Sequence, residues 1–394
     1  MKQLLIIIFI LIAGGAKGYT KDFDYSHITP HPRLLLKEGE ERNIHMVLQK
    51  NTVLQAFHKR ILDYCDETLK EPPVKRIKEG KRLLGVSRIV LKRVFYLSYA
   101  YRMTSEEKYL RRAEKEMLAA ASFTDWNPSH FLDVSEMSMG LAIGYDWLFN
   151  ELLPDSRKKI RQAIVEKAIE ASKTKHASFY KSRTNWNQVC NGGLVCSALA
   201  IYEDEPEKTK EIINKALQTV PLALECYAPD GGYPEGFGYW SYGTSYQVML
   251  NDALESSLGH DAGLSDYPGF LQSAQYIQYM TAPTGDCFNF SDASPKAYGN
   301  IMMFWFAHKT KNPSLLWLEK KYLNDANLEF GEYLEERFLP CLLIFASRID
   351  LDEVTSPKGN TWHSRGKNPV YIYRSGWNSK TDTYLGVKGG TAST

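Results

Sequence analysis

The sequence predicts a mainly α-helical protein built from antiparallel helical hairpins, followed by the beginning of a β-rich module. The first observation is that apolar residues recur with helical spacing from about residue 37 to residue 347. The second is that short turns separate most of these periodic segments, which is typical of helices that pack against their neighbours in sequence. The third is a change near residue 369, after which strand-like alternation and turn residues predict β-structure.

The amino terminus has the features of a secretory signal peptide. Lys2 supplies a positive start, residues 4–12 are all apolar, and small residues follow in a cleavage zone. The apolar run is too short for a permanent transmembrane helix, and an uncleaved anchor is the alternative interpretation. We therefore expect residues 1–18 to be removed, and the mature chain to be periplasmic or secreted with no stable membrane span.

The periodic segments that follow are the expected helices. They lie at residues 38–69 (one helix or two), 83–103, 106–121, 135–149, 154–174, 187–202, 206–224, 242–258, 268–281, 300–308, 313–322 and 332–345. Four longer connections, at residues 123–134, 180–187, 227–241 and 283–299, are rich in Trp, Asn, Asp, Gly or Tyr. Alternate loops of helical hairpins lie at one end, so these connections are expected to line one cleft. Strands are expected at residues 370–374 and 383–388.

Charge and cysteine content exclude several classes of partner. The formal net charge of +2 gives no reason to expect nucleic acid or a strongly anionic membrane. The six cysteines form no CxxC pair and have no metal-like spacing, so neither a metal site nor an essential disulfide framework is expected.

Two blocks near the middle of the chain carry the strongest functional signal. Residues 184–193 read TNWNQVCNGG, and residues 229–243 read PDGGYPEGFGYWSYG. Each block combines amides, aromatic rings or carboxylates with glycines within a short segment. This composition favours a rim that holds a polar ligand between ring faces, and a sugar polymer is such a ligand.

These blocks and several shorter segments resemble the heparinase II/III-like polysaccharide lyases. The resemblance is carried by residues 31–35 (HPRLL), 87–88 (SR), 142–147 (AIGYDW), 185–193, 235–239 (EGFGY) and 291–293 (SDA). It covers essentially the whole mature chain. It implies an exported lyase with an (α/α) toroid followed by a β-sandwich. Residues 19–365 are then expected to form an incomplete toroid that carries the catalytic site.

By the same resemblance, residues 366–394 begin a truncated β-sandwich. Residues 388–394 (KGGTAST) are similar to the run that precedes a histidine-bearing strand in that sandwich, and the sequence ends before such a histidine. A relative's metal site would lie in the absent part of the sandwich. We therefore expect no cofactor within this chain.

A lyase of this kind acts on an acidic polysaccharide or oligosaccharide by β-elimination. It removes the C5 proton of a uronic acid and expels the C4 oxygen, while a donor neutralises the neighbouring carboxylate. We expect Asn187 to be that donor, and Tyr239 to act as base or acid with Tyr242 as the second choice. The alternatives are an N-cap role for Asn187 and ordinary packing for the tyrosines.

The other site residues are expected to contact the substrate. They are Asn191, Glu235, His130, Arg88, Trp186, Trp240 and Glu136. Arg88 has the charge to pair with a substrate carboxylate or sulfate, and the tryptophans have the flat faces that sugars stack on. Each has a structural alternative: an ion pair between helices for Arg88, a structural role for His130, and a core position for the tryptophans.

Two other functions remain open at the level of sequence. A glycoside hydrolase needs two carboxylates across the cleft, and Asp133, Glu136, Asp230, Glu235 and Asp292 supply candidates. A catalytically incomplete glycan-binding protein is the other alternative. The segment from Asn187 to Gly193 has no histidine near the neutralising amide, so the glycan itself, whether a glycosaminoglycan or alginate-like, is left open.

Overall fold

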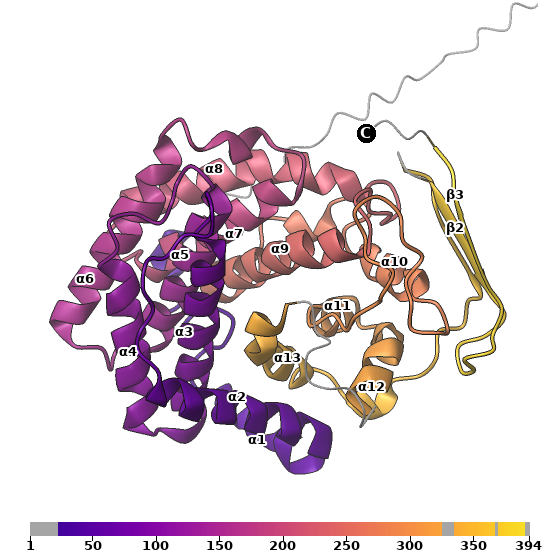
Figure 1. Cartoon of the computed structure of the whole chain (residues 1–394), viewed down its shortest axis with the longest axis horizontal. Coiled ribbons are helices and arrows are strands. Elements are labelled where there is room, and N and C mark those ends of the chain that lie inside the picture. Colours follow the sequence, from indigo (N-terminus) through magenta and orange to yellow (C-terminus); the bar gives the residue numbers. More distant parts are fainter. Residues whose placement is uncertain (1–22, 325–334, 367–368, 391–394) are drawn as a thin grey trace, which may run out of the picture.

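The computed structural model describes residues 23–324, 335–366 and 369–390 (Figure 1). This part of the chain is mainly helical, with a small antiparallel sheet at one side, which confirms the prediction of a mainly α protein. The expected signal peptide and residues 332–334 of the last expected helix lie outside the described residues.

Thirteen α-helices lie within the described residues. They are α1 (Glu41–Lys50), α2 (Thr52–Lys70), α3 (Leu84–Thr104), α4 (Glu107–Ala121), α5 (Phe131–Trp147), α6 (Pro154–Ile164), α7 (Asn185–Ala200), α8 (Pro206–Leu224), α9 (Phe237–Leu258), α10 (Ser273–Met280), α11 (Met303–Thr310), α12 (Trp317–Asn324) and α13 (Leu339–Ala346).

The centre of the protein is formed by α3, α5, α7 and α9, which pack side by side in that order (Figure 1). Every residue of α5 is buried, and Trp186 is the one residue of α7 that is not. A helix that is buried all round must have neighbours on every side, which explains why these two segments carry few charges. The helices α4 and α8 each have one apolar face and cover the central helices from outside.

Glycines allow the central helices to approach closely. A Cβ on Gly140 would lie 2.7 Å from the Cα of Leu91 in α3, and one on Gly193 would lie 2.5 Å from the carbonyl oxygen of Ser135 in α5. Successive contacts between two neighbouring helices have rising residue numbers in both helices. The pairs are Gly140–Leu91 and Gly144–Val94 between α5 and α3, Ser135–Gly193 and Ser138–Ser197 between α5 and α7, and Asn185–Gly243 and Gly192–Tyr246 between α7 and α9. The four central helices are therefore parallel, and their first turns lie at one end of the molecule.

Several helix boundaries differ from the expected ones. The segment 38–69 forms two helices that meet at Asn51, whose side chain accepts hydrogen bonds from the main chain of the first turn of α2. The segment 154–174 is α-helical only to Ile164 and continues as a π-helical turn at Val165–Ile169. Helix α9 begins at Phe237 rather than at residue 242, so Tyr239 and Tyr242 both lie within its first two turns.

The small sheet contains a strand that the sequence analysis missed. Its order is β1 (Thr361–Ser364), β2 (Val370–Arg374) and β3 (Tyr384–Lys388), and both pairings are antiparallel. Strand β1 precedes the expected domain boundary at residue 366. Trp362 and Ile372 face α10 and are buried, whereas Tyr371 and Leu385 on the other face are exposed. The two expected strands are confirmed, and the sheet begins before that boundary.

The segment at residues 29–36 closes the opposite end of the central helices. His31 Nδ1 lies 2.5 Å from Asp146 Oδ1 near the end of α5, and Thr29 N donates to Ser257 O at the end of α9 over 2.9 Å. Arg348, just after α13, donates to the carbonyl oxygen of Leu35 over 2.6 Å. We call residues 29–36 the strap. Because the strap covers one end, the first turns of the central helices form the end that is left for a site.

Candidate functional site

Glu136 connects three elements at the end of the central helices opposite the strap. Its side chain is fully buried in the second turn of α5. Arg88 of α3 donates from Nε to Glu136 Oε1 over 3.0 Å, and the hydroxyl of Tyr242 in α9 donates to the same oxygen over 3.1 Å. Three of the residues that the sequence analysis selected are thus brought into direct contact.

Arg337 completes this cluster. It lies in a short 3-10 turn, Glu336–Phe338, just before α13, and it is 8% exposed. Its Nε donates to Glu136 Oε2 over 2.7 Å and its Nη2 donates to Oε1 over 2.9 Å, so the pair is bidentate. Glu335 forms a second ion pair with the same guanidinium. We call Arg88, Glu136, Tyr242, Glu335 and Arg337 the Glu136 cluster.

The charges of the cluster fix its protonation. Burial favours the neutral form of Glu136, but the charges of Arg337 and Arg88 outweigh burial, and the pKa of Glu136 is lowered. Burial and the adjacent carboxylate of Glu136 raise the pKa of Tyr242 well above its usual value, so its phenol keeps its proton. Burial also raises the pKa of Glu335, although Arg337 opposes this. The cluster therefore presents a protonated phenol held by an ionised carboxylate.

Two guanidinium groups lie against the ring of Tyr242. The carbon at the centre of the Arg88 guanidinium is 5.3 Å from the ring centroid, and that of Arg337 is 5.8 Å away. Cations at this distance from an aromatic ring are attracted to it. The Arg88 side chain is 42% exposed, whereas that of Arg337 is almost fully enclosed. One of the two cations can therefore meet a ligand from solvent.

His130 and Trp186 lie together at the same end. The imidazole of His130 is 5.0 Å from the ring of Trp186, edge to face, and its Nδ1 is 2.6 Å from Asp133 Oδ1. Asp133 also accepts from Asn127 Nδ2 and from the main-chain nitrogen of Leu83, each over 2.6 Å. The carboxylate thus ties the start of α3 to the start of α5 and fixes His130 beside the half-buried Trp186.

Glu235 is partly exposed, whereas Asn187 and Asn191 are buried. Glu235 is partly exposed and accepts from Asn185 Nδ2 over 3.3 Å, and burial followed by the nearby charge of Asp292 raises its pKa. Asn187 is fully buried, and its Nδ2 donates to the carbonyl oxygens of Ser182 and Thr219, each over 2.9 Å. Asn191 is 1% exposed and donates to Asn187. These two amides hold α7 to its neighbours.

The remaining aromatic candidates separate into core and surface. Trp240 is fully buried, and its ring centroid lies 5.8 Å from that of Phe306, within the core. Tyr239 is partly exposed in the first turn of α9. Because Tyr239 and Tyr242 are three residues apart on one helix, they share a face. Tyr239, Tyr242 and Trp186 are therefore the aromatic candidates that keep some exposed surface.

Arg337 is the functional candidate that sequence reasoning missed. It lies 201 positions from Glu136 in sequence, so no local spacing connects the two. The available signal was an arginine next to two glutamates, at residues 335–337, immediately before a strongly apolar run. A charged group in such a position must be paired if it is buried.

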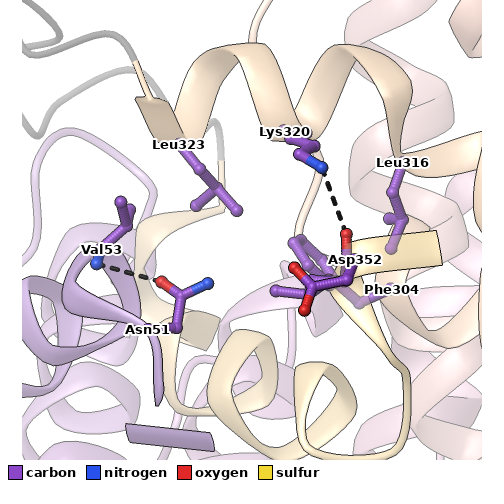
Figure 2. Close-up of a pocket in the computed structure, with 8 residues that line it drawn as sticks. Asn51, Val53, Phe304, Leu316, Lys320, Leu323 and Asp352 are labelled. Carbon is purple, nitrogen blue, oxygen red and sulfur yellow. Dashed lines mark hydrogen bonds between the residues drawn. The ribbon is translucent and has the colours of Figure 1, made fainter. Parts of the chain in front are cut away.

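Neither a metal centre nor the pocket in Figure 2 belongs to this end. Among the described residues, no group of three or more His, Cys, Asp or Glu is arranged to hold a metal ion. The pocket in Figure 2 is lined by residues of the α1–α2 junction, α11, α12 and the segment after α13. There Lys320 Nζ donates to the carbonyl oxygen of Leu351 over 3.3 Å, and none of the candidate residues contributes.

The same described segments contain no helix that is long and apolar enough to cross a membrane. None of the six cysteines, all of which lie within the described residues, forms a disulfide bond, and five of them are buried. No protein-family model matches the sequence, and no curated protein matches it.

Proposed function

We propose that this chain is the helical part of an exported polysaccharide lyase that cleaves a uronic-acid-containing glycan by β-elimination. The observation that carries the proposal is the Glu136 cluster, in which Tyr242, Arg88 and a buried carboxylate meet beside the first turn of α9. The heparinase II/III-like resemblance supports the same reaction. In this proposal, residues 19–365 are an incomplete (α/α) toroid, with α3, α5, α7 and α9 as its inner helices. The sheet supplies the first strands of a β-sandwich.

The reaction needs a base for the C5 proton, and Tyr239 is our choice. It is partly exposed in the first turn of α9, where a sugar ring can reach its hydroxyl. Tyr239, reacting as its phenolate, takes the C5 proton and becomes a phenol, while the electrons of the C5–H bond form the C4–C5 double bond and the C4–O bond is cleaved. The leaving oxygen then needs a proton.

Tyr242 is suited to supply that proton. Burial and the charge of Glu136 raise its pKa, so it keeps its proton in the resting site. When it gives the proton to the leaving oxygen, the phenolate that forms lies against the guanidinium groups of Arg88 and Arg337. These two cations offset part of the cost that burial and the carboxylate of Glu136 impose on the phenolate.

The sugar carboxylate must also be neutralised. The sequence analysis gave this role to Asn187, whose amide is enclosed and donates to two main-chain carbonyls. Arg88 is partly exposed and lies against Tyr242. In our proposal Arg88 therefore takes the carboxylate, and Asn187 holds the start of α7.

The test is the ultraviolet absorbance of unsaturated product when the chain meets a panel of uronate polymers. We expect product, and we expect Tyr239→Phe and Tyr242→Phe each to lower kcat by roughly 100- to 10,000-fold, the usual contribution of a general acid or base. Tyr101→Phe, at the far end of α3, is the matched control and should leave the rate unchanged. New reducing ends without unsaturated product would instead indicate a hydrolase, and binding without either product would indicate a glycan-binding protein.

A further inference from the structure

Among the described residues, the guanidinium of Arg88 is hydrogen-bonded on one edge. Its Nε donates to Glu136 Oε1 over 3.0 Å, and its face lies on the ring of Tyr242. The side chain is 42% exposed although its Glu136 partner is fully buried. An arginine has a planar fork of donors, so fixing Nε also fixes the direction of the two terminal nitrogens.

The carboxylate of Glu136, which accepts from Arg88, also forms an ion pair with Arg337. Arg337 donates to both oxygens of Glu136 and is itself enclosed. Arg337 also forms an ion pair with Glu335, so the cluster contains two arginines and two glutamates. Arg88 is nevertheless open to a further anion, because its side chain is 42% exposed and, among the described residues, Nε is the one nitrogen of its guanidinium with a hydrogen bond.

We propose that Arg88 is the specificity-determining residue of this site: with its Nε edge fixed by Glu136, its terminal nitrogens bind the acid group of a negatively charged sugar. Glu136 and Arg337 are positioning residues, which act by holding Arg88 and the hydroxyl of Tyr242. The inference rests on the proposed function in taking a sugar acid as the ligand. It goes further in assigning the preference for acidic over neutral sugars to one side chain.

A second feature of the cluster supports a fixed rather than a mobile cation. Tyr242 and Arg88 both donate to Glu136 Oε1, so this one oxygen fixes the position of the phenol relative to the guanidinium. A ligand acid bound by Arg88 would then lie at a set distance from the phenol. A lysine at this position would keep the charge but lose both the fork and the contact of Nε with Glu136.

The experiment compares an acid ligand with its methyl ester, which removes the charge and little else. Tetrasaccharides that contain glucuronate, galacturonate or mannuronate are titrated into the protein by calorimetry, as free acids and as methyl esters. Wild type, Arg88→Gln and Arg88→Lys are measured. Arg157→Gln is the matched control, because Arg157 also lies on an aromatic face, 4.6 Å from the ring centroid of Phe149, near the strap end.

We expect wild type to prefer the acid over the ester, and Arg88→Gln to lower this preference by roughly 10- to 100-fold, the range of a charge-assisted hydrogen bond. Arg88→Lys should fall between the two, and Arg157→Gln should keep the full preference. The inference is overturned if Arg88→Gln keeps the preference, if it weakens both forms equally, or if wild type binds neither form.

The positioning role is tested with Glu136→Gln. If Glu136 positions Arg88, this variant should lose the preference for the acid over the ester. If Glu136 has a purely structural role, binding of the acid and of the ester should weaken equally. Thermal melting checks folding, and if this variant does not fold, the partly exposed Arg88 variants decide alone. The two proposals also fail separately. Acid-selective binding through Arg88 without unsaturated product overturns the lyase and keeps this inference. Unsaturated product, together with an unchanged acid-over-ester preference in Arg88→Gln, keeps the lyase and overturns this inference.

Discussion

The bidentate pair between Glu136 and Arg337 makes a sharp prediction for Arg337→Met. Glu136 Oε2 has Arg337 Nε as its hydrogen-bond donor at 2.7 Å, and Oε1 loses one of its donors as well. The substitution therefore leaves a fully buried carboxylate with Arg88 as its remaining cation in the cluster. Glu335 also loses its ion-pair partner.

The expected cost is about 3–5 kcal/mol, the range for removing one partner of a buried pair. Arg88 is too exposed to offset much of this, because water screens its charge. Glu136→Met should cost less, about 1–3 kcal/mol, since Arg337 keeps Glu335 as a counter-ion. The double variant Glu136→Met/Arg337→Met should cost less than the two single variants added together; if it cost no more than Glu136→Met alone, the coupling would equal the full cost of Arg337→Met, about 3–5 kcal/mol.

The assay is urea unfolding followed by circular dichroism, with Arg157→Met as the control. In Arg337→Met the buried carboxyls of Glu136 and Glu335 lose a cation, so their pKa values rise above those of the unfolded chain. The folded state then binds more protons than the unfolded state, and the deficit should shrink between about pH 7 and about pH 5. A cost below about 1 kcal/mol, or a deficit that grows on acidification, would refute the reasoning.

Three further predictions concern packing, protonation and the buried amide. Gly193→Ala should destabilise by roughly 1–3 kcal/mol, because its Cβ would meet Ser135 O at 2.5 Å, whereas Gly238→Ala, with no atom within 4 Å, should be neutral or stabilising in thermal melts; equal effects would contradict this. Burial opposes protonation of His31, but hydrogen bonds to two carboxylates prevail and raise its pKa. Its contribution is present below the unfolded pKa of about 6.5 and lost as pH rises through the folded pKa. The stability gap between wild type and His31→Gln should therefore narrow from about pH 6 to about pH 9, and a constant gap would argue against this. Asn187→Ala should lower stability by about 1–3 kcal/mol, since two buried carbonyls lose their donor; lost activity at unchanged stability would instead restore Asn187 as a catalytic candidate.

The helical elements were predictable because their signal is local. Apolar spacing located most of the helices, and the predominantly apolar character of residues 131–147, which include three acidic residues, is typical of a buried helix. Boundaries were less accurate where tertiary contacts decide them. Helix α9 begins before the sequence suggests, although Gly236 precedes it with φ of 87°, a conformation that suits glycine.

Three of the five residues of the Glu136 cluster were selected from the sequence, but their pairing was not predicted. Residue types identified Arg88, Glu136 and Tyr242, yet nothing local shows that one buried carboxylate joins the other two. Arg337 lies 201 positions from Glu136, and that pairing exists only in the fold. The enclosure of Asn187 could not be predicted either, because its acceptor Thr219 O is brought near only by the packing of α8 against α7, whereas Ser182 O lies in the connection before α7.

The strap has a consequence for the order in which the chain folds. Its partners come late in synthesis: Thr29 bonds to Ser257, and Leu35 accepts from Arg348, which is 313 positions away. Closing so long a loop costs chain entropy that is recovered only when both partners are in place. The strap must therefore wait for α9 and α13, and we expect residues 29–36 to gain hydrogen-exchange protection in the slowest phase of refolding.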